Sequence, residues 1–173
     1  MPEGPETLLA FDFGTVRIGV AIGNTLTQDA RPLDTLDSRV TDRAFLAIAG
    51  LLAEWQPQRL VVGRPLHPDG QEHELTARCE RFARRLHGRF RLPVVMVDER
   101  YSSVEAEGSG SRAGHRAGAT SGGRSTDAHA AAIILRQYLS DPASARPAIA
   151  EASVPQSAKG PSSETSSLQD SAP

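Results

Sequence analysis

Short apolar runs that end in a carboxylate restrict the fold of this chain more than any other feature. Residues 8–11 lead directly into Asp12, and residues 94–97 lead into Asp98 and Glu99. An uninterrupted apolar run of this length is typical of a strand buried on both faces of a sheet. A carboxylate at the end of such a strand is costly unless it is paired or binds a metal ion. We therefore expect these acids to serve a site.

The last helical pattern of the chain begins beside another acid, Asp127. Thr126 is a typical N-cap, and the apolar residues that follow recur at helical spacing. Three separate segments thus each bring a carboxylate to the end of an element, which predicts one acidic metal site. An ordinary capping role explains Asp127 equally well when it is taken alone. The run before Asp98 and Glu99 shows no alternation, so it does not decide which of the two points into the site.

The order of the predicted elements indicates a mixed α/β sheet with helices on both faces. Strands over 8–12, 18–23 and 31–36 are followed by a helix over 45–55, a strand over 60–63, a helix over 75–86, a strand over 93–97 and a helix over 126–138. Short links between the first three strands favour antiparallel pairing, whereas helix-linked strands pair in parallel. This is the element order of the ribonuclease H-like fold.

The 173 residues are expected to form one domain and a tail. Residues 1–140 carry the apolar patterns, whereas residues 141–173 are rich in Ala, Ser and Pro and are predicted to be disordered. The only cysteine, Cys79, lies on an apolar helical stripe, which predicts a core position and excludes an internal disulfide. No signal peptide or membrane-length apolar run is present, so we expect a cytoplasmic protein without a membrane partner.

Basic residues are concentrated in one part of the chain, although the net charge is −2. Residues 78–124 contain ten arginines against five acidic residues. Arg78, Arg81 and Arg85 share one face of a predicted helix, which on charge alone is more often a solvated face than a phosphate-binding surface. Residues 107–125 are rich in glycine and serine and are predicted to be mobile, and the arginines within them are candidates for gripping nucleic acid.

The ordered set of local motifs resembles the YqgF family, also called RuvX. The matching strings are LAFDFGTVRIGVA at 9–21, ARPL at 30–33, VVGRPL at 61–66, DERYSSVEA at 98–106 and DAHAA at 127–131. The family is known for nucleases of pre-16S rRNA maturation and for Holliday junction resolvases. The resemblance implies a ribonuclease H-like fold and metal-dependent phosphodiester hydrolysis, with Mg²⁺ or Mn²⁺ as cofactor and two ions in the site.

The resemblance also implies roles for individual residues. By position, Asp12, Glu99 and Asp127 match the catalytic and metal-binding carboxylates, and Asp98 stays open as the neighbouring alternative. The residues expected to contact the substrate are Thr15, Arg17, Arg100 and Arg124. The family usually carries a more apolar, helix-capable segment, often with lysine near its end, where this chain has residues 107–125.

Other functions remain open from the sequence. A sugar-kinase or actin-type ATPase shares the Asp-x-Gly-Thr hairpin, but such proteins enclose ATP between two domains of this kind. A non-catalytic RNA- or ribosome-binding module is favoured by the sparse segment 107–125. Among nuclease substrates we expect pre-16S rRNA rather than branched DNA, because a junction resolvase acts as a symmetric dimer and no dimer surface is evident. The chain is compatible with a monomer or a homodimer.

Overall fold

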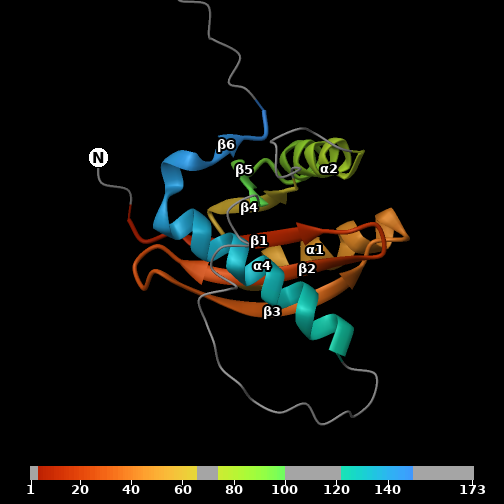
Figure 1. Cartoon of the computed structure of the whole chain (residues 1–173), viewed down its shortest axis with the longest axis horizontal. Helices are drawn as coiled ribbons and strands as arrows, with labels where there is room; N and C mark the ends of the chain where they lie inside the picture. The colour runs from red at the N-terminus through yellow and green to blue at the C-terminus, as the bar shows by residue number, and fades with distance from the viewer. Residues whose placement is uncertain (1–3, 66–73, 100–121, 150–173) are drawn as a thin grey trace, which may run out of the picture.

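The computed structural model describes residues 4–65, 74–99 and 122–149. The strands are β1 (Thr7–Phe13), β2 (Arg17–Asn24), β3 (Asp29–Asp37), β4 (Arg59–Arg64), β5 (Val94–Asp98) and β6 (Arg146–Pro147). The helices are α1 (Thr41–Trp55), α2 (Glu74–Phe90) and α4 (Gly122–Ser140), and a short 3₁₀ turn, η2, covers Pro142–Ser144. The strands form one sheet in the order β3-β2-β1-β4-β5-β6 (Figure 1).

The strand pairing confirms the predicted mixed sheet. β1 and β3 both pair antiparallel with β2, whereas β4 pairs in parallel with β1 and β5. The first hairpin is closed by the Gly14 N–H, which donates to the Arg17 carbonyl at 2.9 Å. The parallel strands β1, β4 and β5 therefore end at the same edge of the sheet.

Alternate residues of β1 point to opposite faces of the sheet, and this alternation decides where its carboxylate lies. Leu9 and Phe11 belong to the core cluster that includes the buried residues of α1 and α2. Leu8 and Ala10 belong to the second cluster, with the residues of α4. Asp12 continues this second set, so its side chain projects from the face that α4 covers.

The helices cover both faces of the sheet, as predicted. α4 crosses one face, and α1 and α2 lie against the other (Figure 1). α1 ends at Trp55, where Gln56 takes the left-handed conformation (φ 46°) immediately before Pro57. Cys79 is 1% exposed in the core, which confirms its predicted position. In the described parts of the chain, no helix has the length and apolar character needed to span a membrane.

The start of α4 differs from the prediction. The helix begins at Gly122, so residues 122–125 are helical rather than part of a mobile stretch, and Thr126 is not the N-cap. Glycine disfavours a helix by about 1 kcal/mol, which is why the sequence pattern indicated a loop. Packing of α4 across β1, β2 and β3 outweighs this local preference. The rest of the predicted mobile stretch, residues 107–121, lies outside the described residues.

Residues 141–149 also differ from the prediction of a disordered tail. η2 and β6 return the chain to the sheet, where Arg146 and Pro147 pair antiparallel with β5. The Ala148 N–H donates to the Val94 carbonyl at 2.9 Å, and Ala148 is buried. A strand of two residues has no apolar alternation for sequence analysis to detect. Residues 150–173 lie outside the described residues.

Candidate functional site

Asp12 and Glu99 meet on the face of the sheet that α4 covers. Glu99 directly follows β5, and its carboxyl group is hydrogen-bonded to that of Asp12. Its side chain lies over Gly63 of β4, where an added Cβ would collide with the Glu99 carboxyl and with Ile134 of α4. Two ionised carboxylates cannot donate to each other, so this contact requires a proton on one of them.

The shared proton follows from the surroundings of the pair. Burial raises the pKa of Glu99 to about 7, and the negative charge of Asp12 and the hydrogen bond between them act in the same direction. Burial also raises the pKa of Asp12, as does the charge of Asp127, whereas the hydrogen bond from Glu99 lowers it. Glu99 is therefore the partner that carries the proton when no cation is bound.

Asp127 approaches the pair from α4, where it is the sixth residue and not, as predicted, in the first turn. Its backbone lies directly on Gly19 of β2, where an added Cβ would collide with the Asp127 carbonyl oxygen. Gly19 is the register partner of Asp12, so this close approach brings Asp127 near enough to act on the pKa of Asp12. The missing side chain at Gly19 thus sets the position of the helix.

Arg17 pairs with Asp127. Its Nε lies 3.1 Å from Asp127 Oδ2, and both side chains are partly exposed. The alignment is not that of a hydrogen bond, because the buried Oδ2 accepts none from the described residues. An ion pair of this kind contributes little to stability, about 0–1 kcal/mol. Asp127 Oδ2 therefore lies beside the positive charge of Arg17, but its lone pairs accept no hydrogen bond from the described residues.

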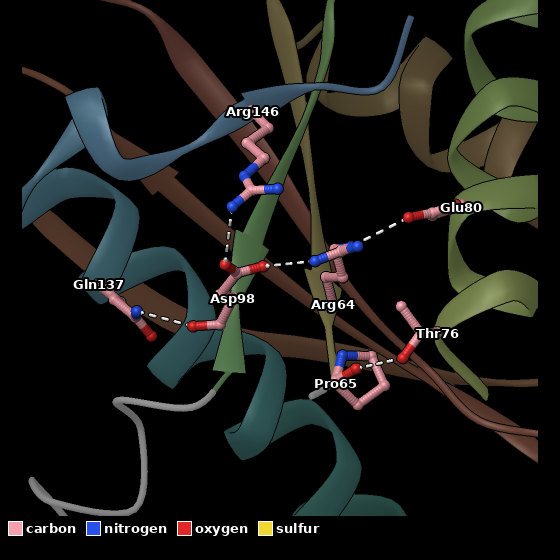
Figure 2. Close-up of polar contacts among 7 residues, drawn as sticks. All are labelled: Arg64, Pro65, Thr76, Glu80, Asp98, Gln137 and Arg146. Carbon is pink, nitrogen blue, oxygen red and sulfur yellow. Dashed lines mark hydrogen bonds and ion pairs between the residues drawn. The ribbon is translucent and has the colours of Figure 1, made fainter. Parts of the chain in front are cut away.

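Asp98 points toward Arg64 (Figure 2) and continues the alternation of Met96, which faces the helices α1 and α2 and not α4. Its Oδ1 lies 3.3 Å from Arg64 Nη1, and Arg64 Nε lies 3.0 Å from Glu80 Oε1. Arg64 is 6% exposed, so this is a buried cation between two carboxylates. On the main chain, Gln137 Nε2 donates to the Asp98 carbonyl at 3.0 Å. The structure therefore brings Glu99, and not Asp98, together with Asp12.

The remaining predicted substrate contacts are placed in part. Thr15 is exposed in the hairpin between β1 and β2, close to Arg17. Arg100 lies outside the described residues, and Arg124 lies in the first turn of α4, with no described side chain. The sequence patterns did not point to Gly63, Arg64 or Gln137. Arg64 had a signal of the same kind as Asp12, because it is a charged residue at the end of an apolar strand.

The chemistry of these residues fits a divalent cation. All the donors are carboxylate oxygens, the ligands that Mg²⁺ and Mn²⁺ prefer. Burial and the charge of Asp12 raise the pKa of Glu99 to about 7, so the pair gains from a nearby positive charge, which a cation would supply in place of a proton. Within the described residues, no group of three His, Cys, Asp or Glu side chains lies close enough together to hold one ion. Asp12 and Glu99 form a two-residue cradle, and Asp127 would have to turn from Arg17 to join it.

The chain is similar in sequence to a family of known proteins. Residues 6–141 match the model of the family RuvX, described as Holliday junction resolvase. A protein of Paraburkholderia phymatum named "Putative pre-16S rRNA nuclease" is 56% identical over 133 residues, covering 77% of this chain and 84% of the relative. A protein of the same name from Polynucleobacter necessarius is 49% identical over 137 residues, covering 79% of this chain and 86% of the relative.

The fold is similar to that of a solved structure. RuvC of Thermus thermophilus, in complex with a Holliday junction substrate, aligns with a TM-score of 0.52 at 15% sequence identity. The alignment covers 82% of this chain and 99% of RuvC. At this identity the likeness concerns the fold alone, and it supports the ribonuclease H-like architecture expected from the order of elements.

Proposed function

The chain belongs to the RuvX family, and we propose that it is a metal-dependent nuclease that hydrolyses phosphodiester bonds in the 5′-end processing of pre-16S rRNA. The observation that carries this proposal is the hydrogen-bonded contact between Asp12 and Glu99. Two half-buried carboxyl groups held together at the edge of a sheet destabilise each other and gain most from a bound cation. We place the protein in the cytoplasm, where its substrate would be made.

In the proposed reaction, Asp12 and Glu99 hold the cation and Asp127 completes the ligand set. A bound Mg²⁺ or Mn²⁺ would supply Lewis-acid activation of the phosphodiester and of water, with two ions as the expected number. Gly63 leaves the space in which the Glu99 side chain lies. Arg17, next to Asp127, offers a guanidinium to a substrate phosphate once Asp127 turns to the cation.

The substrate is proposed to be RNA because of the relatives. The curated proteins that are about half identical to this chain are named for pre-16S rRNA. Their alignments cover most of both chains. The family description names the Holliday junction instead, and a four-way DNA junction is therefore the second substrate to test.

The deciding experiment compares cleavage of a pre-16S 5′-leader RNA and a four-way DNA junction, each with Mg²⁺, with Mn²⁺ and with EDTA. Wild type is compared with Asp12→Asn, and Glu54→Gln, an exposed carboxylate of α1 far along the chain from the site, is the matched control. We expect metal-dependent RNA cleavage by wild type and Glu54→Gln and none by Asp12→Asn. Cleavage of the junction alone would replace the RNA substrate, and cleavage of neither would overturn the nuclease function.

A further inference from the structure

A pocket of about 280 Å³ lies on the face of the sheet opposite Asp12, between the start of α1 and the middle of α2. Its polar lining comes from three segments: Ser38 before α1, Thr41 at the start of α1, and Arg78, Arg81 and Arg85 of α2. Its volume is close to the lower limit of about 300 Å³ for small-molecule sites. The pocket has the size of a single nucleotide or a smaller ligand.

The positive charge of the pocket favours the binding of an anion. Its lining includes three arginines and no acidic residue. Arg78 is paired with Glu74 at 2.9 Å, and Arg85 lies 5.0 Å above the ring of Phe45. Arg81 is exposed and makes no ion pair with the described residues. Three guanidinium groups within two helical turns repel one another, and a phosphate would relieve that repulsion.

The start of α1 borders the same pocket. Thr41 is its first residue, and the preceding N-cap, Val40, makes no side-chain capping bond. The first amides of the helix therefore keep their positive ends free of a capping side chain, in a pocket that three arginines already line. The partial positive charge at the start of α1 adds to the charge of the three arginines.

Three phenylalanines belong to the lining of the pocket: Phe13, Phe45 and Phe82. Phe13 is half-buried and stacks on Phe82, with ring centroids 4.9 Å apart and planes inclined by 30°. Aromatic rings beside cationic side chains suit a ligand that joins a phosphate to a ribose or a base. The pocket thus matches a nucleotide better than it matches inorganic phosphate.

The backbone links this pocket to the catalytic carboxylates. Phe13 follows Asp12 directly in β1, so the two residues lie on opposite faces at the same edge of the sheet. Resting on the proposed function, we propose that the pocket binds a nucleotide of a single-stranded segment of the substrate, a few nucleotides from the scissile phosphate. A strand that reaches both faces has to bend around the hairpin that joins β1 and β2. Duplex DNA, with a persistence length of about 150 base pairs, resists such a bend, whereas a single strand does not.

The test measures binding without cleavage. Full-length Asp12→Asn protein, with and without Arg81→Glu, is titrated against a fluorescein-labelled 12-nucleotide oligouridine and against a blunt duplex of equal length. Arg84→Glu is the matched control, because Arg84 is an exposed arginine of the same helix outside the pocket lining. We expect Arg81→Glu to weaken single-strand binding at least tenfold, and Arg84→Glu less than threefold. We expect every variant to bind the duplex more weakly than the protein with wild-type pocket residues binds the single strand. The variants should differ little from one another in their affinity for the duplex.

The outcomes separate this proposal from the nuclease function. Equal single-strand binding by the Arg81→Glu and Arg84→Glu proteins would overturn the pocket, whether or not wild type cleaves RNA. A selective loss at Arg81→Glu would support the pocket even if no cleavage were found. Competition with uridine monophosphate distinguishes a strand from a free nucleotide. If the mononucleotide binds as tightly as the oligomer, the pocket serves a free nucleotide and the single-strand proposal is wrong.

Discussion

The proton shared by Asp12 and Glu99 makes the stability of the metal-free protein depend on pH. Burial raises the pKa of Glu99 from an ordinary 4.5 to about 7, so the folded protein binds this proton more tightly than the unfolded chain does. The stabilisation is complete below pH 4.5 and is lost as the pH rises to 7. We expect wild type to lose about 2 kcal/mol of unfolding free energy across this window relative to Glu99→Gln. Urea denaturation in EDTA measures the unfolding free energy of both proteins across this pH range. Parallel plots of unfolding free energy against pH for wild type and Glu99→Gln would contradict the prediction.

Divalent cations are expected to replace the same proton. At pH 8, millimolar Mn²⁺ should raise the melting temperature of wild type, because an ion that binds only the folded state stabilises it by mass action. At pH 5 the rise should be smaller, since the cation competes with a bound proton. Asp12→Asn should abolish the effect, and Glu54→Gln should preserve it. A similar Mn²⁺ shift in Asp12→Asn would place the cation elsewhere.

At the scale of elements, the end of β5 sends two adjacent carboxylates to opposite faces. Asp98→Asn weakens the buried contact with Arg64 and should lower the free energy of unfolding by about 2–3 kcal/mol. The loss is smaller than for breaking a whole buried ion pair, because Glu80 still pairs with Arg64. At a temperature where it is folded, its cleavage rate should stay within a few-fold of wild type. Glu99→Gln should be at least as stable as wild type and lose at least about 100-fold in rate. Circular dichroism and the cleavage assay distinguish the two, and the reverse pattern would assign the site to Asp98.

The contact between α4 and β2 depends on Gly19. Gly19→Ala places a Cβ against the Asp127 backbone, so we expect a loss of about 2–3 kcal/mol and displacement of Asp127. Gly50→Ala is the control, because that glycine lies in α1 with open space around it and alanine should stabilise the helix by about 0.5–1 kcal/mol. Thermal unfolding of both variants, with Mn²⁺ affinity, gives the measurement. Similar effects at the two positions would show that Gly19 is not a packing requirement.

At the scale of the whole molecule, β6 extends the domain beyond residue 140. A chain ending at Ser140 loses the pairing of β6 with β5 and the Ala148–Val94 hydrogen bond. We expect it to be about 1–2 kcal/mol less stable than the full chain. A chain ending at Ile149 should match the full chain in both stability and cleavage. If the two truncations behave alike, β6 contributes nothing and the domain ends at residue 140 as the sequence indicated.

Most of the architecture was predictable because it depends on local patterns. Apolar runs and helical spacing gave the order of strands and helices, and short links gave the antiparallel hairpins. The exceptions are the first turn of α4 and strand β6. Both contain residues with no apolar periodicity, and the segment of β6 is held by contact with a distant segment, through the Ala148–Val94 hydrogen bond.

The order of residues in the chain specifies which groups are available to a site: carboxylates at the ends of buried strands, where an unpaired charge is costly. Which of these carboxylates meet depends on the folded sheet. Alternation along β1 and β5 sends Asp12 and Glu99 to one face and Asp98 to the other, and only the completed sheet gives those faces different neighbours. Gly63 likewise looks like an ordinary strand residue until Glu99 lies over it. The reason is that burial and charge act through space, so the protonation of these carboxyls is set by neighbours that are distant in the chain.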